Sequence, residues 1–169
     1  MFQVLVFVFE NYAHNQACPE LAHLERKLNA VGFEADEIQE ALAWLDDLNL
    51  AARGLQSVSA DRADEPTLAL VVPERLVQSP NSMRVYATVE QNHLGPDCLG
   101  FVTFLESAGV LPAYIREIVM DRAMAAPGGP VPLDDFKIIV LMVYWSLGVE
   151  PDPLVLDELC GDNVERVAH

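Results

Sequence analysis

Apolar residues recur at helical spacing through the first 50 residues of the chain. Residues 2–14 have an apolar side and a polar side, although their β-branched and aromatic residues would also suit a strand. The next segment begins at Pro19, which suits a first helical position, and ends at Gly32, which suits a left-handed stop. Residues 35–48 carry acids in their first turn and then an apolar stripe. We predict three helices whose core positions include Val4, Leu5, Val8, Phe9, Tyr12, Leu21, Leu24, Leu28, Val31, Ile38, Ala41, Leu42, Leu45 and Leu48.

The helical pattern disappears between residues 51 and 82. Gly54 and several prolines interrupt it, and charged residues cluster within this segment. Two β-prone runs, residues 67–72 and 83–87, could pair as a short hairpin, but the neighbouring prolines restrict them to an edge or a wing. We predict a linker with at most one short hairpin.

Helical periodicity returns in the second half of the chain. Asp97 is a candidate N-cap for a helix that stops at Gly109, and Pro112 begins another helix. Residues 132–147 predict the most apolar helix, with acids at its N-terminal end and Gly148 after it. A short last helix is expected over residues 152–160.

These elements predict a mostly α-helical protein whose N-terminal half resembles a helix-turn-helix, in the element order of a winged helix. The expected organisation is an N-terminal three-helix unit (residues 1–50), a linker with a possible hairpin (51–87), a C-terminal helical unit (88–160) and a frayed tail (161–169). We expect the two helical units to share one core or to pack closely.

The composition argues against a disordered chain and against a winged helix that binds DNA. The 169 residues include 26 acids and 10 bases, for a net charge of -16, and 51% of them are hydrophobic, which excludes a disordered chain. A winged helix would place its third helix in the DNA major groove, but residues 34–50 contain six acids and no base. Direct nucleic-acid binding is therefore the alternative and not the main prediction.

Membrane association and a disulfide framework are not expected. No base precedes the apolar run at the start of the chain, and the run at residues 138–145 is shorter than the roughly 20 residues of a membrane span. The three cysteines, Cys18, Cys98 and Cys160, form no Cys-x-x-Cys pair. They predict reduced thiols and a cytoplasmic protein.

Two groups of residues have spacing that could support chemistry. Glu10, His14 and Cys18 are four residues apart, but Pro19 disfavours a continuous helix there, so we predict no metal site. Glu117 and Asp121 lie one helical turn apart. Because Arg116 and Arg122 flank them, we interpret this face as solvated and mixed in charge.

No phosphate-binding loop or nucleophile motif appears. We therefore predict a protein that is not an enzyme and has no cofactor, with an enzyme that uses an unrecognised pocket as a further alternative. Arg84, near the possible wing, is interpreted as a solvated loop residue.

The third predicted helix carries the preferred partner site. Core packing is the default for Trp44, but this residue lies near the edge of the apolar stripe. If Trp44 bordered solvent, it would resemble an interface anchor with an acidic rim. The predicted partner-binding residues are Phe33, Glu37, Glu40, Trp44 and Asp47.

The chain as a whole resembles the Smg family of bacterial proteins. The resemblance rests on strings such as MFQVL (residues 1–5), FENY (9–12), ALAWL (41–45), SMRVY (82–86) and LDDFK (133–137). It implies a cytoplasmic helical protein, often encoded near a DNA-processing protein of natural transformation and a topoisomerase, and it brings no known activity, ligand or catalytic residue. The connection at residues 51–82 and Gln3, where an acid is expected, depart from the family pattern.

The sequence therefore predicts a non-catalytic protein that acts through protein–protein contacts or regulation. Its acidic surface would meet a more basic partner, and a DNA-handling protein is one candidate.

Overall fold

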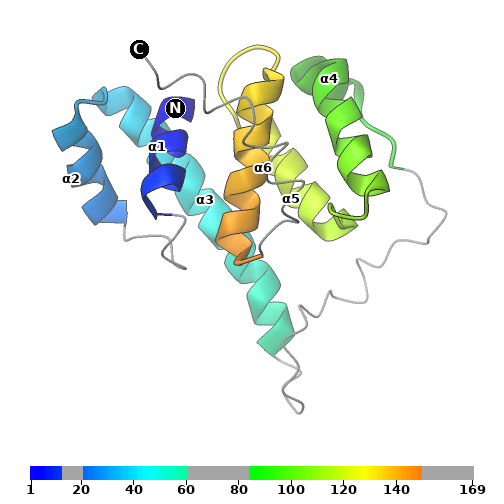
Figure 1. The fold of residues 1–169 in the computed structure, drawn as a ribbon, viewed down its shortest axis with the longest axis horizontal. Coiled ribbons are helices and arrows are strands. Elements are labelled where there is room, and N and C mark those ends of the chain that lie inside the picture. The colour runs from blue at the N-terminus through cyan, green and yellow to red at the C-terminus, as the bar shows by residue number, and fades with distance from the viewer. Residues whose placement is uncertain (13–20, 61–83, 150–169) are drawn as a thin grey trace.

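The structure is a computed structural model that describes residues 1–12, 21–60 and 84–149. These residues form six helices and no strand (Figure 1). The predicted mostly α-helical class is confirmed. The helices are α1 (Phe2–Tyr12), α2 (Leu21–Val31), α3 (Ala35–Ala60), α4 (Thr88–Ser107), α5 (Ala113–Met124) and α6 (Leu133–Leu147).

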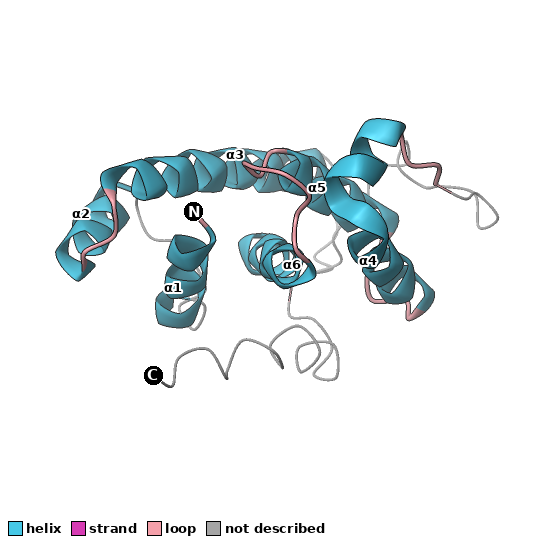
Figure 2. Cartoon of the chain, turned by 90° about the horizontal axis from the view of Figure 1, so that it is seen from above, coloured by secondary structure: helices cyan, strands magenta, loops and turns pink. Residues whose placement is uncertain are grey.

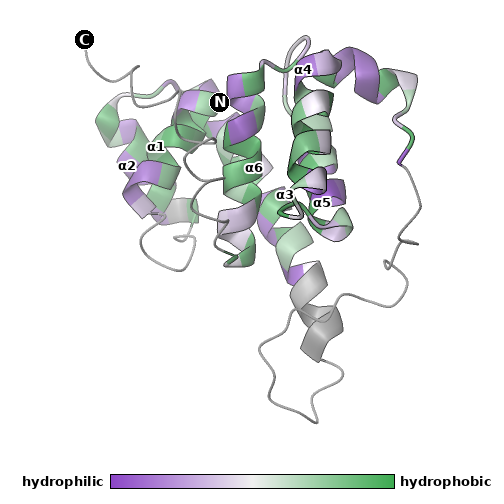
Figure 3. Ribbon diagram, turned by 45° about the vertical axis from the view of Figure 1, so that its right-hand side comes forward, coloured by the Kyte–Doolittle hydropathy of each residue, from purple (hydrophilic) through white to green (hydrophobic). Residues whose placement is uncertain are grey.

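Helix α6 is the centre of the fold. It packs against α1, α3, α4 and α5, so helices of both predicted units meet around it (Figure 2). Its residues from Phe136 to Tyr144 are all buried, and all of them except Lys137 are apolar or aromatic; much of the visible helix has the colour of hydrophobic residues in Figure 3. The buried side chains of all six helices form one hydrophobic cluster. The expectation that the two units share a core is therefore met in the described residues.

The bounds of α6 agree closely with the sequence pattern. Pro132 precedes the first turn, and Asp134 and Asp135 lie in that turn near the positive end of the helix dipole. Gly148 ends the helix in a left-handed conformation with a φ of 65°. Among the described helices, none is both long and apolar enough to cross a membrane.

Helix α3 is longer than predicted. It continues from Leu48 to Ala60, so residues 51–60 belong to a helix and the prediction of a linker there is wrong. Gly54 lies inside this helix. A single glycine destabilises a helix by only about 1 kcal/mol, so it does not by itself end the helix. Arg84 to Ala87 form no strand, and the other run of the predicted hairpin lies outside the described residues.

Helix α4 begins earlier than predicted. Its first residue is Thr88, and the carboxylate of Glu90 accepts a hydrogen bond of 2.6 Å from the backbone N–H of Ala87. Gly95 has a φ of 70° and Pro96 follows it, and together they kink the helix. This kink interrupts the helical pattern in the sequence. Asp97 is therefore not the N-cap of α4 but lies just after its kink. The predicted helix at residues 152–160 lies outside the described residues.

Candidate protein interaction site

Helix α3 lies across the other helices with one long side facing outward (Figure 2). Its inner side is buried against α1, α2, α5 and α6. At about 100° per residue, the exposed positions fall within one arc of the helix. This arc, here called the acidic face, consists of Asp36, Gln39, Glu40, Ala43, Asp46, Asp47 and Leu50.

The acidic face combines negative charge with one apolar side chain. Leu50 is 71% exposed, and α3 contains a single base, Arg53. Within the described residues, Glu40 and Asp46 have no ion-pair partner, whereas Asp47 lies 3.3 Å from the guanidinium of Arg122. The outward charge of this face therefore comes mainly from acids that no base of the described residues neutralises.

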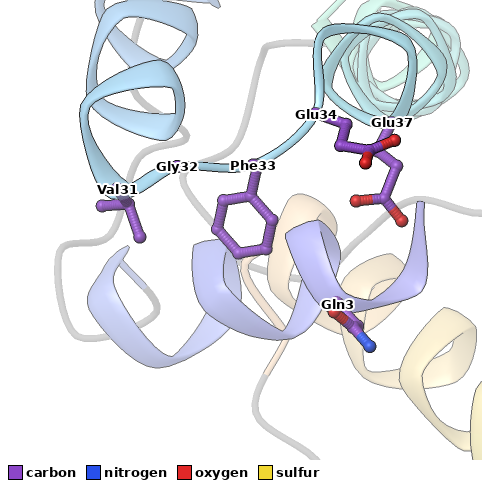
Figure 4. Close-up of a pocket in the computed structure, with 6 residues that line it drawn as sticks. All are labelled: Gln3, Val31, Gly32, Phe33, Glu34 and Glu37. Atoms are coloured by element: carbon purple, nitrogen blue, oxygen red, sulfur yellow. The ribbon is translucent and has the colours of Figure 1, made fainter.

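A hollow of about 440 Å³ lies beside the first turn of α3, between that turn and α1 (Figure 4). This volume is within the range of about 300–1,000 Å³ that is typical of sites for small ligands. The hollow exists because the chain reverses direction between α2 and α3, where Gly32 adopts a φ of 104° that other residues rarely adopt. It is lined by Gln3, Val31, Gly32, Phe33, Glu34 and Glu37.

The residues of the hollow differ in their contacts. The ring of Phe33 meets the ring of Phe7 edge to face, with centroids 5.6 Å apart, so its position is held by α1. Val31 is 55% exposed although it is apolar. The amino group of Met1 lies 3.5 Å from Oε1 of Glu37. Within the described residues, no basic side chain pairs with Glu34.

The structure brings together four of the five predicted partner residues. Phe33 and Glu37 line the hollow, while Glu40 and Asp47 lie on the acidic face. Trp44 does not belong with them, because it is only 4% exposed. Its indole N–H donates a hydrogen bond of 2.9 Å to the backbone carbonyl of Arg122 in α5. Interpreting Trp44 as an exposed anchor is therefore wrong, and core packing, the default, is right.

Five charged residues form a network that sequence reasoning missed. Arg84 donates hydrogen bonds to the carboxylates of both Glu90 and Glu117, at distances of 2.7 to 3.2 Å. Arg116 is only 3% exposed and pairs with Glu106 and Glu117. This arginine network connects the segment before α4 with both ends of α4 and with α5. Interpreting Arg84 as a solvated residue is therefore wrong. The face of Glu117 and Asp121 is mixed in charge as predicted, with side chains 44% and 66% exposed, although Arg116 beside it is buried.

The network changes the titration of its carboxyl groups. The hydrogen bond from Arg84 lowers the pKa of Glu90 below its usual value, although partial burial acts in the opposite direction. Burial raises the pKa of Glu117, but the hydrogen bonds and charges of Arg84 and Arg116 outweigh it and lower the pKa overall. Both glutamates are therefore charged at neutral pH.

The sequence contained no local signal for this network. Arg84 and Glu117 are 33 positions apart, and Arg116 and Glu106 are 10 apart, so no helical spacing connects either pair. Only the pairing of α4 with α5 brings these groups together.

The candidate catalytic groups have other roles in the structure. Glu117 pairs with two arginines of the network, and Asp121 accepts hydrogen bonds of 2.8 and 3.0 Å from Arg122, so both carboxylates are paired. The Cys98 thiol donates to the carbonyl of Val131 at 3.3 Å, and burial raises its pKa to about 11, which keeps it protonated.

The N-terminal group of Glu10, His14 and Cys18 lies only in part within the described residues. Within residues 1–12, 21–60 and 84–149, no three His, Cys, Asp or Glu residues are grouped so that they could hold a metal ion. His14 and Cys18 of the spaced group with Glu10 lie outside these ranges.

Comparisons with known proteins identify the family. Residues 1–169 match the family model described as "Protein of unknown function (DUF494)". The chain is 52% identical to the protein Smg homolog of Methylibium petroleiphilum and 51% identical to that of Leptothrix cholodnii, in each case over 169 residues and 100% of both chains. The chain belongs to the Smg family. It is also 46% identical to the Smg homolog of Bordetella avium over 170 residues, again across 100% of both chains.

Membership of the Smg family confirms the resemblance seen in the sequence. Because the relatives from Methylibium and Leptothrix align over their full lengths, a long connection at residues 51–82 does not distinguish this chain from them. No solved structure matches the chain. The description of the family assigns no activity, so function is argued from the surface of this chain.

Proposed function

We propose that this member of the Smg family is a non-catalytic interaction or regulatory protein that acts in the cytoplasm and docks a basic partner protein on the acidic face of α3. The observation that carries the proposal is the exposure of Glu40 and Asp46 on one side of a long helix, with no base paired to either among the described residues. Leu50 adds an exposed apolar contact at the end of that face.

A basic protein is the partner that this surface fits best. Opposite charge accelerates association and suppresses partners of the same sign. The three arginines of α5 and of the segment before α4 (Arg84, Arg116 and Arg122) are all paired with acids, so they add little to any positive surface. The gene neighbourhood implied by the family resemblance makes a DNA-handling protein a candidate partner, bound through its own basic surface.

Affinity capture at two salt concentrations tests the proposal. The tagged chain is used in about 0.1 M and about 1 M salt, between which the Debye length falls from about 10 Å to about 3 Å. Captured proteins are identified by mass spectrometry, purified and titrated against the chain. We expect a partner of basic composition whose binding weakens strongly at the higher salt concentration. An acidic partner, or binding that ionic strength does not change, would overturn the proposal.

Matched charge reversals locate the binding surface. The double variant Glu40→Lys with Asp46→Lys should weaken partner binding by about tenfold or more, which corresponds to about 1.4 kcal/mol. The control variant Glu10→Lys with Asp97→Lys changes the same charge at exposed residues of α1 and α4 and should change binding by less than about twofold. Equal effects of the two variants would mean that net charge, and not the acidic face, attracts the partner.

A gel-shift experiment at low salt tests the nucleic-acid alternative. We expect no shift of duplex DNA or single-stranded RNA, because phosphates and the acidic face repel each other. A shift that Glu40→Lys does not change would favour nucleic-acid binding through another surface.

A further inference from the structure

We propose that the hollow between α1 and the turn from α2 to α3 binds the side chain of an arginine that the partner protein supplies. This inference rests on the proposed function and names the anchor through which the partner docks. The anchor lies at one end of the acidic face, because Glu37 lines the hollow in the first turn of α3 and Glu40 follows it one turn later.

The polar groups of the hollow fit a guanidinium. Glu34 and Glu37 enter it from the start of α3, and the side chain of Gln3 lies on the opposite side, on α1 (Figure 4). Carboxylates accept hydrogen bonds in pairs from the planar fork of arginine, and a side-chain amide supplies a further acceptor oxygen. A lysine ammonium is a compact and strongly hydrated charge without this fork, so it should fit less well.

The apolar groups of the hollow fit the stem of the same side chain. Val31 is more than half exposed, and Phe33 is partly exposed while its ring is held by Phe7. The methylene groups of arginine lie readily along apolar surface while the charged end stays with polar groups. Both parts of an arginine side chain therefore find matching groups within one hollow of about 440 Å³.

The carboxylates of the hollow can accept a further cation. The amino group of Met1 already pairs with Glu37, which shows that a cation is stable beside this carboxylate. Among the described residues, no base pairs with Glu34, so one negative charge of the hollow lacks a partner. An arginine side chain would neutralise it.

An NMR titration with acetyl-arginine amide tests the inference on the full chain. The backbone amides of Gly32 and Phe33 report on the hollow, and we expect saturable chemical-shift changes there. Two other probes are used: acetyl-norleucine amide has a similar stem without charge, and acetyl-lysine amide has a different cation. Both should bind at least threefold more weakly.

Two variants make the result specific. Glu34→Gln should weaken binding of acetyl-arginine amide by about fivefold or more, since it removes a charge that no base of the described residues neutralises. Glu10→Gln makes the same change at an exposed residue of α1 that does not line the hollow and should alter binding by less than twofold. Amide spectra that retain the wild-type dispersion show that each variant is folded.

Specific outcomes overturn the inference. Absence of saturable changes at Gly32 and Phe33, equal binding of the lysine or norleucine probe, or equal effects of the two variants would each do so. Partner capture that still responds to Glu40→Lys with Asp46→Lys would then leave the proposed function intact. Conversely, arginine binding in the hollow without a salt-sensitive partner would overturn the proposed function alone.

Discussion

The acids of α3 and the acids around α4 and α5 lie in contrasting surroundings. On the acidic face of α3, Glu40 and Asp46 point to solvent without a paired base among the described residues. Around α4 and α5, Glu90, Glu106 and Glu117 surround two arginines that are buried or nearly so. Acids therefore pair with arginines between helices in one region and stay exposed on a helix face in the other.

The difference comes from where the arginines lie. Arg116 is buried between α4 and α5, and a buried cation is stable only when anions satisfy it. In α3 the single base, Arg53, is exposed, and among the described bases only Arg122 pairs with an acid of the acidic face, at Asp47. Acid content alone thus does not say whether a region of this protein serves stability or recognition.

The largest effect is expected from removing the central cation of the arginine network. Arg116→Ala should lower the free energy of unfolding by about 3 kcal/mol, because Glu106 and Glu117 lose the arginine between them. Urea denaturation followed by circular dichroism measures it. Arg53→Ala, the matched control on α3, should change stability by no more than about 0.5 kcal/mol. Similar losses for the two variants would remove the contrast between the regions.

A smaller loss of stability is expected at the contact between α3 and α5. Trp44→Phe should cost about 2 kcal/mol, because it removes the indole N–H that bonds to the carbonyl of Arg122 and leaves that acceptor buried. Thermal and urea unfolding measure the loss. Trp145→Phe makes the same change in volume at a partly buried site of α6, and the loss should be smaller. If Trp145→Phe costs as much, lost volume and not the hydrogen bond explains the effect.

The smallest change in stability is expected for Arg84, and it should depend on pH. Arg84→Met should cost about 1 kcal/mol at neutral pH, because the ion pairs that it breaks are partly exposed. The pKa values of Glu90 and Glu117 are lower in the folded protein than the usual 4.5. Their contribution to the free energy of unfolding is therefore complete above about pH 4.5. It is lost as the pH falls through the lowered pKa values of the folded protein.

The measurement is the free energy of unfolding of the parent chain and of Arg84→Met between neutral and acidic pH. The difference between them should shrink toward zero on the acidic side. Glu40→Gln, outside the network, should change stability at neutral pH by no more than about 0.5 kcal/mol. A gap between the parent chain and Arg84→Met that is constant with pH would mean that the methionine acts through packing alone.

Residues of α6 show how much of the fold was predictable. Its bounds follow from Pro132, its first-turn acids, a long apolar run and Gly148, all of which act locally. The sequence pattern did not predict the last residues of α3 or the first residues of α4, and both differences have physical reasons. In α3, Gly54 and the small and polar residues near it weaken the apolar stripe without ending the helix. In α4, Gly95 and Pro96 are residues typical of a helix end, so the sequence does not indicate that the helix begins before them.

The candidate site was partly predictable. Helical spacing predicts that Glu40 and Asp47 share an exposed face of α3, and both are exposed there; their role in partner binding stays a prediction. Trp44 was misplaced as a possible anchor because a position at the edge of the apolar stripe is buried or exposed according to the neighbouring helix. Here α5 covers it and supplies the carbonyl that its indole N–H binds.

The sequence by itself determined the helical class, the apolar side of most helices and the excess of negative charge, because these depend on composition and on spacing within one segment. Only the tertiary structure decided which acids became partners of Arg84 and Arg116 and which stayed exposed. It also created the hollow, which joins Gln3 of α1 to the turn before α3. Such groupings depend on distances between segments far apart in the chain, and no local pattern encodes those distances.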